Sequence, residues 1–389
     1  MQSLHRASLW LLRASLLSLC CMLLMATGSA LAEEPVHPDA HTDADTDTQT
    51  DTQTDTHTDT HTDTHAGSHA DTHVPIGMAP IGVMGDHVHH EGGMMLSYRY
   101  MKMRMDGNRD GSKQKSRSDL LLPDGDWPVV PTDMDMEMHM LGFMYAPRNH
   151  LSLMLMVPIL KKSMDHTTSM AVDFTTESTG LGDIGVAALV NVWGDDMHEV
   201  HLNLGASFPT GSINRQDETP ASGGDLVALP YPMQLGSGTV DLRPGATYNG
   251  RRDELLWGAQ LHGTIRLGRN KEDYRLGNDY VLTGWSTYKI LDWLSGGLRI
   301  QYKQWFNIKG RDRRIAGMGV FDPEDFVPTA DPNRQAGKRL ELGPSVNFFR
   351  VKGPLEGVRL GVEALFPLYR DLDGPKLEMD WTLIAGIEY

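Results

Sequence analysis

Histidine and carboxylate side chains crowd the first quarter of the chain. Residues 35–73 repeat Thr-Asp-Thr-His or Thr-Asp-Thr-Gln, a period that spaces five histidines four residues apart. Imidazole and carboxylate groups are ligands for Zn²⁺, Cu²⁺ and Ni²⁺. The candidate ligands in the repeat are His57, His61, His65, His69 and His73. We therefore predict a metal-capable segment, with copper or zinc as the expected ions.

The repeat does not predict a helical metal motif. Asp and Thr are poor helix formers because their side chains compete for backbone hydrogen bonds. The segment also lacks apolar residues whose burial would offset the entropy lost on ordering. We predict a disordered segment that holds an ion in several interchangeable modes, or an acidic, hydrophilic spacer that binds none.

A more compact metal candidate lies just downstream. Residues 84–90 read Met-Gly-Asp-His-Val-His-His and place Asp86, His87, His89 and His90 close together in the chain. Flanking glycines would let this cluster fold around an ion. A polar lead-in to a first strand is an equally good interpretation.

The chain begins with a segment typical of export. Residues 1–32 have basic residues early, an apolar run, and the small-residue ending Ala30-Leu31-Ala32. This pattern predicts a cleavable signal peptide; the alternative, an uncleaved anchor helix, is disfavoured because Arg13 splits the apolar run. Cys20 and Cys21 lie inside the run, so the exported chain is expected to form no disulfide.

The net charge of −16 comes mostly from one segment. Residues 33–92 hold 13 carboxylates and no Lys or Arg, whereas the 297 residues from 93 to 389 hold 33 basic against 38 acidic side chains. A nearly balanced main body makes nucleic acid an unexpected partner. We divide the chain into a signal peptide (1–32), a disordered His/Asp/Thr-rich segment (33–92) and a folded body (93–389).

From residue 93 onward, apolar and polar residues alternate with a period of two, as in strands with one apolar face. Twelve such segments lie near 94–105, 133–145, 150–158, 182–193, 198–208, 239–249, 255–267, 279–290, 294–308, 339–350, 357–366 and 378–389. Short connections alternate with long ones, which span 106–132, 159–181, 209–238, 268–278, 309–338 and 367–377. An even strand number with alternating short and long connections is typical of bacterial outer-membrane barrels.

The sequence thus predicts an all-β fold, an antiparallel up-and-down transmembrane barrel of about twelve strands. It would lie in outer-membrane lipid, with the N-terminal tail and Tyr389 in the periplasm. The competing fold is a secreted soluble β-sandwich, which also alternates apolar and polar residues. The strands are nearer the roughly 9–11 residues that cross a bilayer, which favours the barrel.

Alternation also predicts which side chains face the lumen. The polar faces of two segments, 294–308 and 378–389, place Arg299, Gln301, Lys303, Asp380 and Glu388 there, where they would set a charge preference. The 23 methionines gather on single strand faces, as in Met134-Met136-Met138-Met140. Since Asp133, Asp135 and Glu137 take the other face, we expect these methionines to face lipid as apolar filler. The alternative is a thioether path for Cu(I) or Ag(I).

Signals for catalysis are weak, and we predict that the protein is not an enzyme. Ser163, Asp165 and His166 are neighbours in sequence, which establishes no triad geometry. The chain has no Gly-x-Ser-x-Gly elbow and no phosphate loop. Residues 106–111 alternate oxygen ligands as calcium loops do, but Arg109 interrupts them, and a polar external loop is the preferred interpretation.

Several motifs resemble a known group. Residues 80–87 (Pro-Ile-Gly-Val-Met-Gly-Asp-His), 94–111, 138–147, Gly180-Leu181-Gly182-Asp183 and Phe208-Pro209-Thr210-Gly211 are similar to segments of an outer-membrane transporter-like family related to the MetA-pathway phenol-degradation proteins. The resemblance covers about residues 78–389. It implies a barrel that transports small solutes, aromatic or hydrophobic ones among them, and it carries over no catalytic residue.

The Thr-Asp-Thr-His repeat lies outside this resemblance. The leading hypothesis is therefore an outer-membrane channel or transporter with a metal-capable periplasmic tail. The alternative is a barrel-anchored copper- or zinc-binding protein for metal handling, in which the barrel serves as the anchor.

Overall fold

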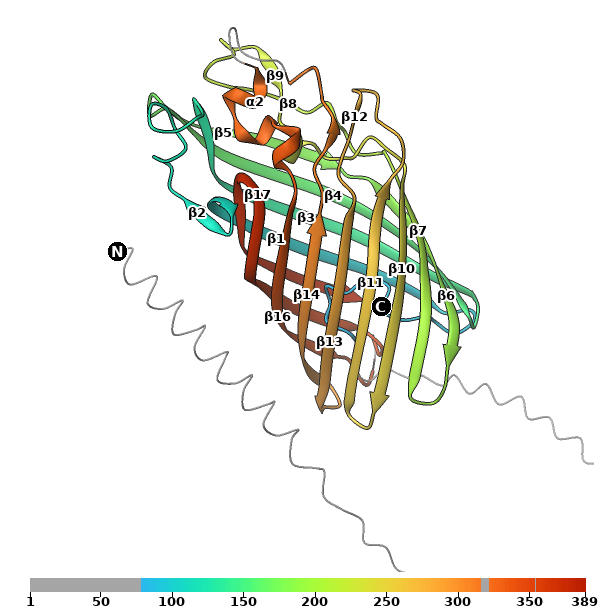
Figure 1. Ribbon diagram of the computed structural model, residues 1–389. Coiled ribbons are helices and arrows are strands. Elements are labelled where there is room, and N and C mark those ends of the chain that lie inside the picture. Colours follow the sequence, from blue (N-terminus) through green and yellow to red (C-terminus); the bar gives the residue numbers. More distant parts are fainter. Residues whose placement is uncertain (1–77, 316–321, 354) are drawn as a thin grey trace, which may run out of the picture. The chain divides into compact units, whose positions relative to one another are not determined.

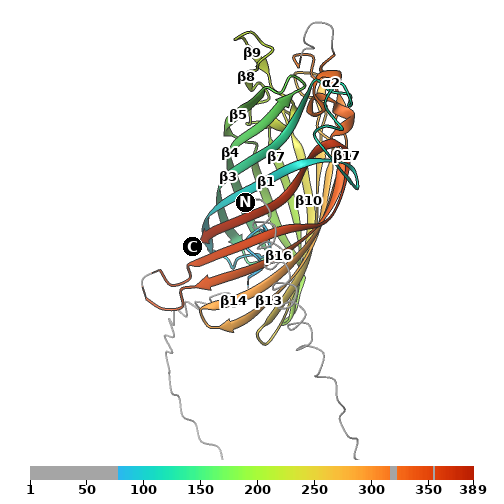
Figure 2. The same ribbon diagram turned by 90° about the vertical axis from the view of Figure 1, so that its left-hand side faces the viewer.

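The structure is a computed structural model that describes residues 78–315, 322–353 and 355–389, all within one compact unit, His69–Tyr389. Its long antiparallel strands form a wall that closes on itself, because β1 (Met94–Gly111) pairs with both β3 (Val129–Arg148) and β17 (Arg359–Glu388). Figures 1 and 2 show the tilted strands running around a closed barrel. The predicted all-β antiparallel barrel is confirmed.

The remaining elements divide between the wall and its connections. The other wall strands are β4 (Leu151–Thr168), β6 (Ile184–Gly194), β7 (His198–Phe208), β10 (Asp241–Arg252), β11 (Leu255–Arg266), β13 (Asp279–Leu291), β14 (Leu294–Trp305) and β16 (Gly337–Phe349). The long connections carry β2 (Lys113–Lys115), β5 (Asp173–Leu181), β8 (Gln216–Glu218), β9 (Leu226–Ala228), β12 (Tyr274–Arg275), β15 (Lys309–Gly310), α2 (Pro323–Phe326) and the 3₁₀ turns η1 (Tyr231–Met233), η2 (Pro328–Ala330) and η3 (Pro332–Arg334).

Eleven strand elements close the wall in the described part of the chain, and the last of them contains a reversal. Residues 359–372 of β17 pair antiparallel with β16, and residues 377–388 pair antiparallel with β1. The chain therefore turns back near Asp373-Gly374-Pro375, and β17 crosses the wall twice. The eleven elements thus correspond to the twelve predicted segments, but the connection predicted at 367–377 is mostly strand.

A second predicted loop is also strand. The sequence predicts a connection at 159–181, whereas β4 continues to Thr168 and its upper part pairs with β5. Lys161 and Lys162 lie in this paired part of β4, and the strand continues past Pro158. The upper strands simply extend beyond the apolar band.

The outer face of the wall is apolar. Large apolar side chains on alternate residues are more than a third exposed, among them Leu96 (61%), Leu141 (51%), Leu204 (57%), Leu261 (54%), Leu282 (53%), Ile300 (48%) and Leu360 (49%). A continuous apolar surface of this extent is unfavourable in water and favourable against acyl chains. The pattern is that of a barrel whose outer face contacts lipid.

Aromatic side chains border this apolar band at both ends. Exposed aromatics at the end with short connections are Tyr145, Trp193, Tyr288, Trp293, Phe348 and Tyr389; those at the other end are Phe208, Tyr280, Phe306 and Tyr369. Aromatic girdles mark the two membrane–water interfaces of such barrels. No helix within the described ranges is long and apolar enough to cross a membrane.

The two ends of the barrel differ. Connections such as 149–150, 195–197, 253–254 and 292–293 are short and share one end, which we call the short-turn end, and the long connections share the other, the long-loop end. Tyr389 meets Leu96 at the short-turn end through two backbone hydrogen bonds of 2.7 and 2.9 Å. The start of β1 and the end of β17 thus lie together there.

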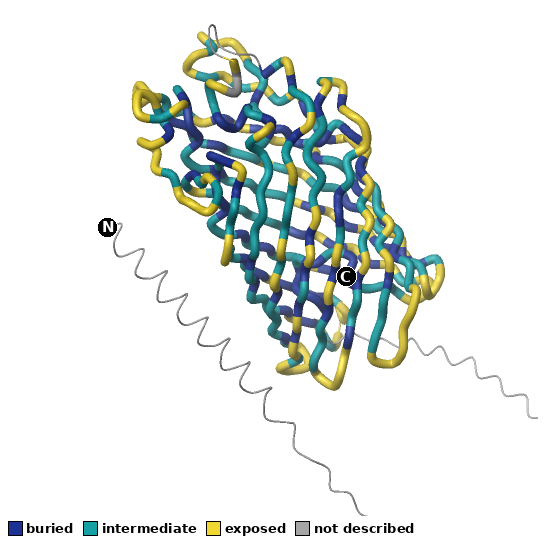
Figure 3. Tube along the Cα trace, viewed as in Figure 1, coloured by how far each residue is buried: buried dark blue, intermediate teal, exposed yellow. Residues whose placement is uncertain are grey.

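The inner face is polar and tightly filled toward the short-turn end. Figure 3 shows buried and exposed residues alternating along the strands. Buried polar side chains include Ser97, Arg99, Ser152, His201, Thr247, Gln260, Arg299, Asn347, Arg359, Glu363, Thr382 and Glu388. This inner face contacts the segment that precedes β1 rather than an open pore.

Candidate functional site

The segment 78–93, which we call the lead-in, lies inside the barrel toward the short-turn end. Ala79, Ile81 and Val83 are at most 4% exposed, with Ile81 fully buried. Ile81 packs against Leu365 of β17 and Ile384 of the same element. The sequence places disorder up to residue 92, but from residue 78 the chain has defined contacts with the wall.

Two arginines of the wall hold the lead-in through its backbone. Arg99 donates from Nε to the Ile81 carbonyl at 2.9 Å, and Arg359 donates to the Ala79 carbonyl. Both guanidinium groups also pair with Glu388, Arg359 at 2.9 Å. The Glu388 carboxylate thus compensates the charges of Arg99 and Arg359, and both arginines donate hydrogen bonds to carbonyl groups of the lead-in.

A second ion pair lies on the next part of the lead-in. The Arg299 Nε lies 2.6 Å from Glu363 Oε1, and Glu363 Oε2 accepts a hydrogen bond from the Gly82 amide at 2.9 Å. A Cβ on Gly82 would fall 2.5 Å from that carboxylate oxygen and 2.7 Å from Arg299. Only glycine leaves room for this approach of backbone to wall.

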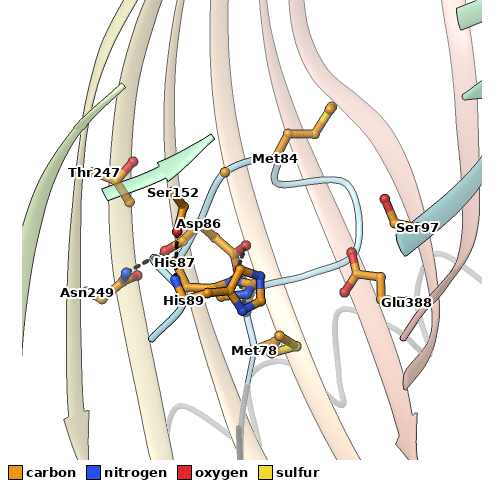
Figure 4. A network of polar contacts seen from close by, with 12 residues as sticks. Met78, Met84, Asp86, His87, His89, Ser97, Ser152, Thr247, Asn249 and Glu388 are labelled. Atoms are coloured by element: carbon orange, nitrogen blue, oxygen red, sulfur yellow. Dashed lines mark hydrogen bonds and ion pairs between the residues drawn. The ribbon is translucent and has the colours of Figure 1, made fainter. Parts of the chain in front are cut away.

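Polar side chains from the opposite wall complete the attachment. His201 Nε2 lies 3.0 Å from the Gly85 carbonyl, Gln260 donates to the Met84 carbonyl at 3.0 Å, and Asn249 donates to the Asp86 carbonyl at 2.5 Å. The His89 amide donates to Ser152 Oγ at 2.9 Å. Figure 4 shows the lead-in held between these strands.

The predicted metal cluster is only partly assembled. Asp86 Oδ1 lies 2.9 Å from His87 Nδ1, and its Oδ2 accepts from the Ala79 amide at 3.2 Å (Figure 4). The rings of His87 and His89 meet edge to face at 4.7 Å, and His90 is exposed. Within the described residues, no three His, Cys, Asp or Glu side chains are grouped to hold an ion. Metal binding here stays a prediction.

Electrostatics ties Asp86 to His87. Burial disfavours both charged forms, but the Asp86 carboxylate raises the pKa of His87, and the imidazole lowers the pKa of Asp86 well below its usual range. Burial and the neighbouring His87 lower the pKa of His89 to about 4. His87 therefore serves as the partner of a buried carboxylate. The five histidines His57, His61, His65, His69 and His73 lie outside the described residues.

At the long-loop end, the barrel contains a cavity of about 500 Å³ that is partly open to the outside. Its lining comes from strands around the wall and from the connections that cover it, including η1 and residues 234–237. Lys162 fixes this cover, since its Nζ donates to the Pro232 and Gln234 carbonyls at 2.7 and 2.6 Å. The connecting loops thus cover this cavity on its long-loop side.

Methionines form much of the cavity wall. Met105, Met134, Met136, Met164 and Met379 all line it. Met134 and Met164 are 3% and 1% exposed and pack with Leu229, Met233 and Leu377. The expectation that these methionines face lipid is wrong. On β3 it is Asp135 and Glu137 that point outward, where they pair with Arg104 and Lys102 of β1 at 3.1 and 3.4 Å.

The predicted lumen residues have different surroundings. Arg299 and Glu388 are buried at the lead-in, Gln301 donates to Glu341 at 2.8 Å on the inner wall, and Lys303 lines the cavity. Asp380 lies at an irregularity in the pairing of β17 with β1. Trp381 pairs with Arg104 and Met379 with Met105, so strict alternation, which predicted that Asp380 faces the lumen, is interrupted there. As a consequence Met379, expected on the lipid face, lines the cavity.

Sequence reasoning missed several cavity residues. Lys162, Arg339, Arg370 and Lys376 line the cavity. Three of them, Lys162, Arg370 and Lys376, lie in segments that the sequence predicted to be loops, 159–181 and 367–377. Extending the alternation of Met154 and Met156 by three steps along β4 would have placed Lys162 on the inner face. No sequence signal identifies the loop residues 231–237 as its cover.

A closed antiparallel wall with a lipid-compatible outer band and an occluded, solute-sized interior defines an integral outer-membrane β-barrel protein. A family profile described as the MetA pathway of phenol degradation matches residues 123–320, so the chain belongs to that family. The fold is that of outer-membrane β-barrel proteins. The resemblance inferred from the motifs is confirmed.

One solved structure shares the fold, and others are similar over most of the chain. The chain is similar to an outer membrane channel from Pseudomonas putida F1, with a TM-score of 0.52, 13% identity, and coverage of 79% of this chain and 100% of that one. It also matches the KdgM porin (TM-score 0.36, 11% identity, 76% and 98% coverage) and the translocator domain of the autotransporter NalP from Neisseria meningitidis (0.42, 8%, 78% and 90%). A search of curated proteins gave no match.

Proposed function

We propose that this protein is an outer-membrane channel that admits small, largely apolar solutes, aromatic ones included, from the long-loop end. The observation that carries the proposal is the cavity of about 500 Å³ inside the barrel wall, which is lined by methionine and aromatic side chains such as Met136, Tyr231 and Trp305. A cavity of this size and composition suits a small organic molecule. Methionine adapts its shape to different apolar ligands.

The lead-in is the element that must yield for a solute to pass. It lies across the lumen between the cavity and the short-turn end, where Arg99, Arg359 and Glu363 bind its backbone. These are side-chain contacts to single backbone groups, so the lead-in can leave while the strand ladders of the wall stay paired. We propose that the lead-in gates the channel.

The direction of the pathway follows from the connections. Short turns are periplasmic and long loops external in bacterial outer-membrane barrels. Met78, the first described residue of the lead-in, lies 3.3 Å from Arg359 at the start of β17, so we propose that the residues before it lie in the periplasm. Solute would then move from the cavity, past the lead-in, into the periplasm.

Current block in a planar bilayer tests this function. Benzyl alcohol, a neutral aromatic, is added at the long-loop side while ion current through single molecules of the purified chain is recorded. We expect interruptions of the current whose frequency rises with concentration, because the solute occupies the path of the ions. Glycerol, of similar polarity at its hydroxyls but without an apolar body, is expected to leave the current unchanged. Equal effects of both solutes, or no current at all, would refute the proposal.

A further inference from the structure

The cavity at the long-loop end carries an excess of positive charge. Its cationic lining residues are Lys162, Arg266, Lys303, Arg339, Arg370 and Lys376. Its carboxylates are Asp183 and Asp279. Asp183 is occupied by hydrogen bonds to the connecting loops. It accepts from the Gly211 amide at 2.9 Å and from the amide and hydroxyl of Ser237 at 2.7 and 2.8 Å.

Three of the cations have carboxylate partners in the wall. Arg339 lies 3.2 Å from Glu341 and Arg370 lies 2.6 Å from Glu378. The third, Arg266, pairs with Asp241 and lies 3.7 Å from Asp279. The three cavity arginines therefore have carboxylate partners, and the three cavity lysines remain to be considered.

The lysines have no such partner. Among the described residues, no carboxylate oxygen lies within 4.0 Å of the ammonium groups of Lys162, Lys303 or Lys376. Lys162 and Lys376 bind backbone carbonyls instead, Lys376 through the Gln335 carbonyl at 2.7 Å. A half-buried ammonium without a counter-charge is costly, and an anion entering beside it would be favoured.

Two of these cations converge on one aromatic ring. The Lys376 ammonium lies 5.4 Å and the Arg339 guanidinium 5.8 Å from the centroid of Trp305. Lys303 is the register partner of Arg339 on the neighbouring strand and shares its inward face. Like charges held this close repel each other, and a carboxylate placed among the three would relieve that repulsion.

The rest of the cavity is apolar. Met105, Met134, Met136 and Met164 line it from β1, β3 and β4. Thioethers also bind soft cations such as Cu(I), but the surrounding positive charge opposes a metal cation in this space. The methionines therefore suit the apolar body of an organic molecule better than a metal ion.

We propose that this cavity is a binding site for a small amphiphilic anion, an organic carboxylate with an aromatic or aliphatic body. The carboxylate binds among Lys303, Arg339 and Lys376, and the body packs on the methionines. The inference rests on the proposed function, because it names the class of solute that the same cavity would take.

Calorimetric titration of the full chain in a non-ionic detergent tests the site with benzoate and benzyl alcohol, which differ mainly in charge. We expect benzoate to bind at least about tenfold more tightly, the effect of one charge-assisted hydrogen bond gained. Replacing the two lysines of the proposed carboxylate site, as Lys303→Gln with Lys376→Gln, is expected to bring the two affinities to within about twofold while benzyl alcohol binding persists. Lys338→Gln is the matched control: Lys338 lies on the opposite face of β16 and pairs with Asp371 at 3.0 Å.

Folding of each variant is checked by its heat-dependent migration on gels. If the double variant does not fold, Lys303→Gln alone is used, and it is expected to lose part of the preference for benzoate over benzyl alcohol. Equal affinities in the unaltered chain, or a tenfold preference that survives both substitutions, would overturn the proposal. Current block by benzyl alcohol without any benzoate preference would refute this inference and leave the proposed function standing. Benzoate preference without any ion current would refute the channel and leave the binding site standing.

Discussion

Glu363 accepts a hydrogen bond from the amide of Gly82, 281 residues earlier in the chain, at 2.9 Å. Its other oxygen pairs with Arg299 at 2.6 Å. The contact joins the lead-in to the wall at a point where a side chain would not fit. It is one of several contacts that hold the proposed gate against the wall.

Gly82→Ala is expected to displace the lead-in. The added Cβ would lie 2.5 Å from Glu363 and 2.7 Å from Ile384, closer than such atoms approach in folded proteins. We expect a higher single-channel conductance with the barrel still folded. Gly284→Ala is the control, because a Cβ there has its nearest neighbour at 3.7 Å. A conductance that is equal in the two variants would argue against a lead-in gate.

Glu388→Gln is expected to destabilise the barrel strongly. Arg99 and Arg359 both pair with Glu388 in the buried interior, so the substitution leaves two guanidinium groups without compensation. Breaking a buried pair costs about 3–5 kcal/mol. Unfolding by guanidinium in lipid vesicles measures the loss.

Glu137→Gln is the comparison for that experiment. Glu137 pairs with Lys102 at 3.4 Å on the outer face, with both side chains about a third exposed. A pair of this kind contributes at most about 1 kcal/mol. Similar losses for the two variants would show that the inner network does not have the stabilising role we assign to it.

Met136→Gln is expected to weaken solute binding. Met136 lines the cavity. Exchanging its apolar surface for an amide is expected to weaken the free energy of solute binding by roughly 1 kcal/mol. The concentration of benzyl alcohol that blocks the current should then rise about fivefold. Met170→Gln, on a loop residue that is 82% exposed, is expected to leave block unchanged. Equal shifts in both variants would place the block outside the cavity.

Deleting residues 33–77 is expected to remove metal binding. The sequence assigns Cu²⁺ or Zn²⁺ coordination to the histidines of the repeat, in several sites of modest affinity. Titration of the full chain with Zn²⁺ should show uptake that the shortened chain lacks. Uptake that survives the deletion would instead point to His87, His89 and His90.

Sequence periodicity predicted the wall well because a strand with one face in lipid must alternate. Most strand boundaries on the short-turn side agree within a few residues, as at β7 and β11. The errors fall where strands extend above the apolar band, since polar residues then occupy both faces and Lys162 looks like a loop residue. The bulge at Asp380 reverses the face of Met379 and leaves no trace in the pattern.

The occluded lumen was harder to predict. Ile81 and Gly82 belong to a segment without strand or helix, and their contacts are with residues about 300 positions away, such as Glu363 and Ile384. The polar inner face of the barrel suggested water-filled space, whereas Arg99 and Arg359 face backbone carbonyls of the lead-in. Such pairing depends on the closed fold and not on local pattern.

The gating role of the lead-in is tested most directly by single-channel conductance of two truncated chains. One lacks residues 33–77 and keeps the lead-in, and the other lacks residues 33–91. We expect the first to match the full chain and the second to conduct several-fold more current, since only the second opens the lumen past Arg99 and Glu363. Equal conductance of the two folded chains would contradict the account.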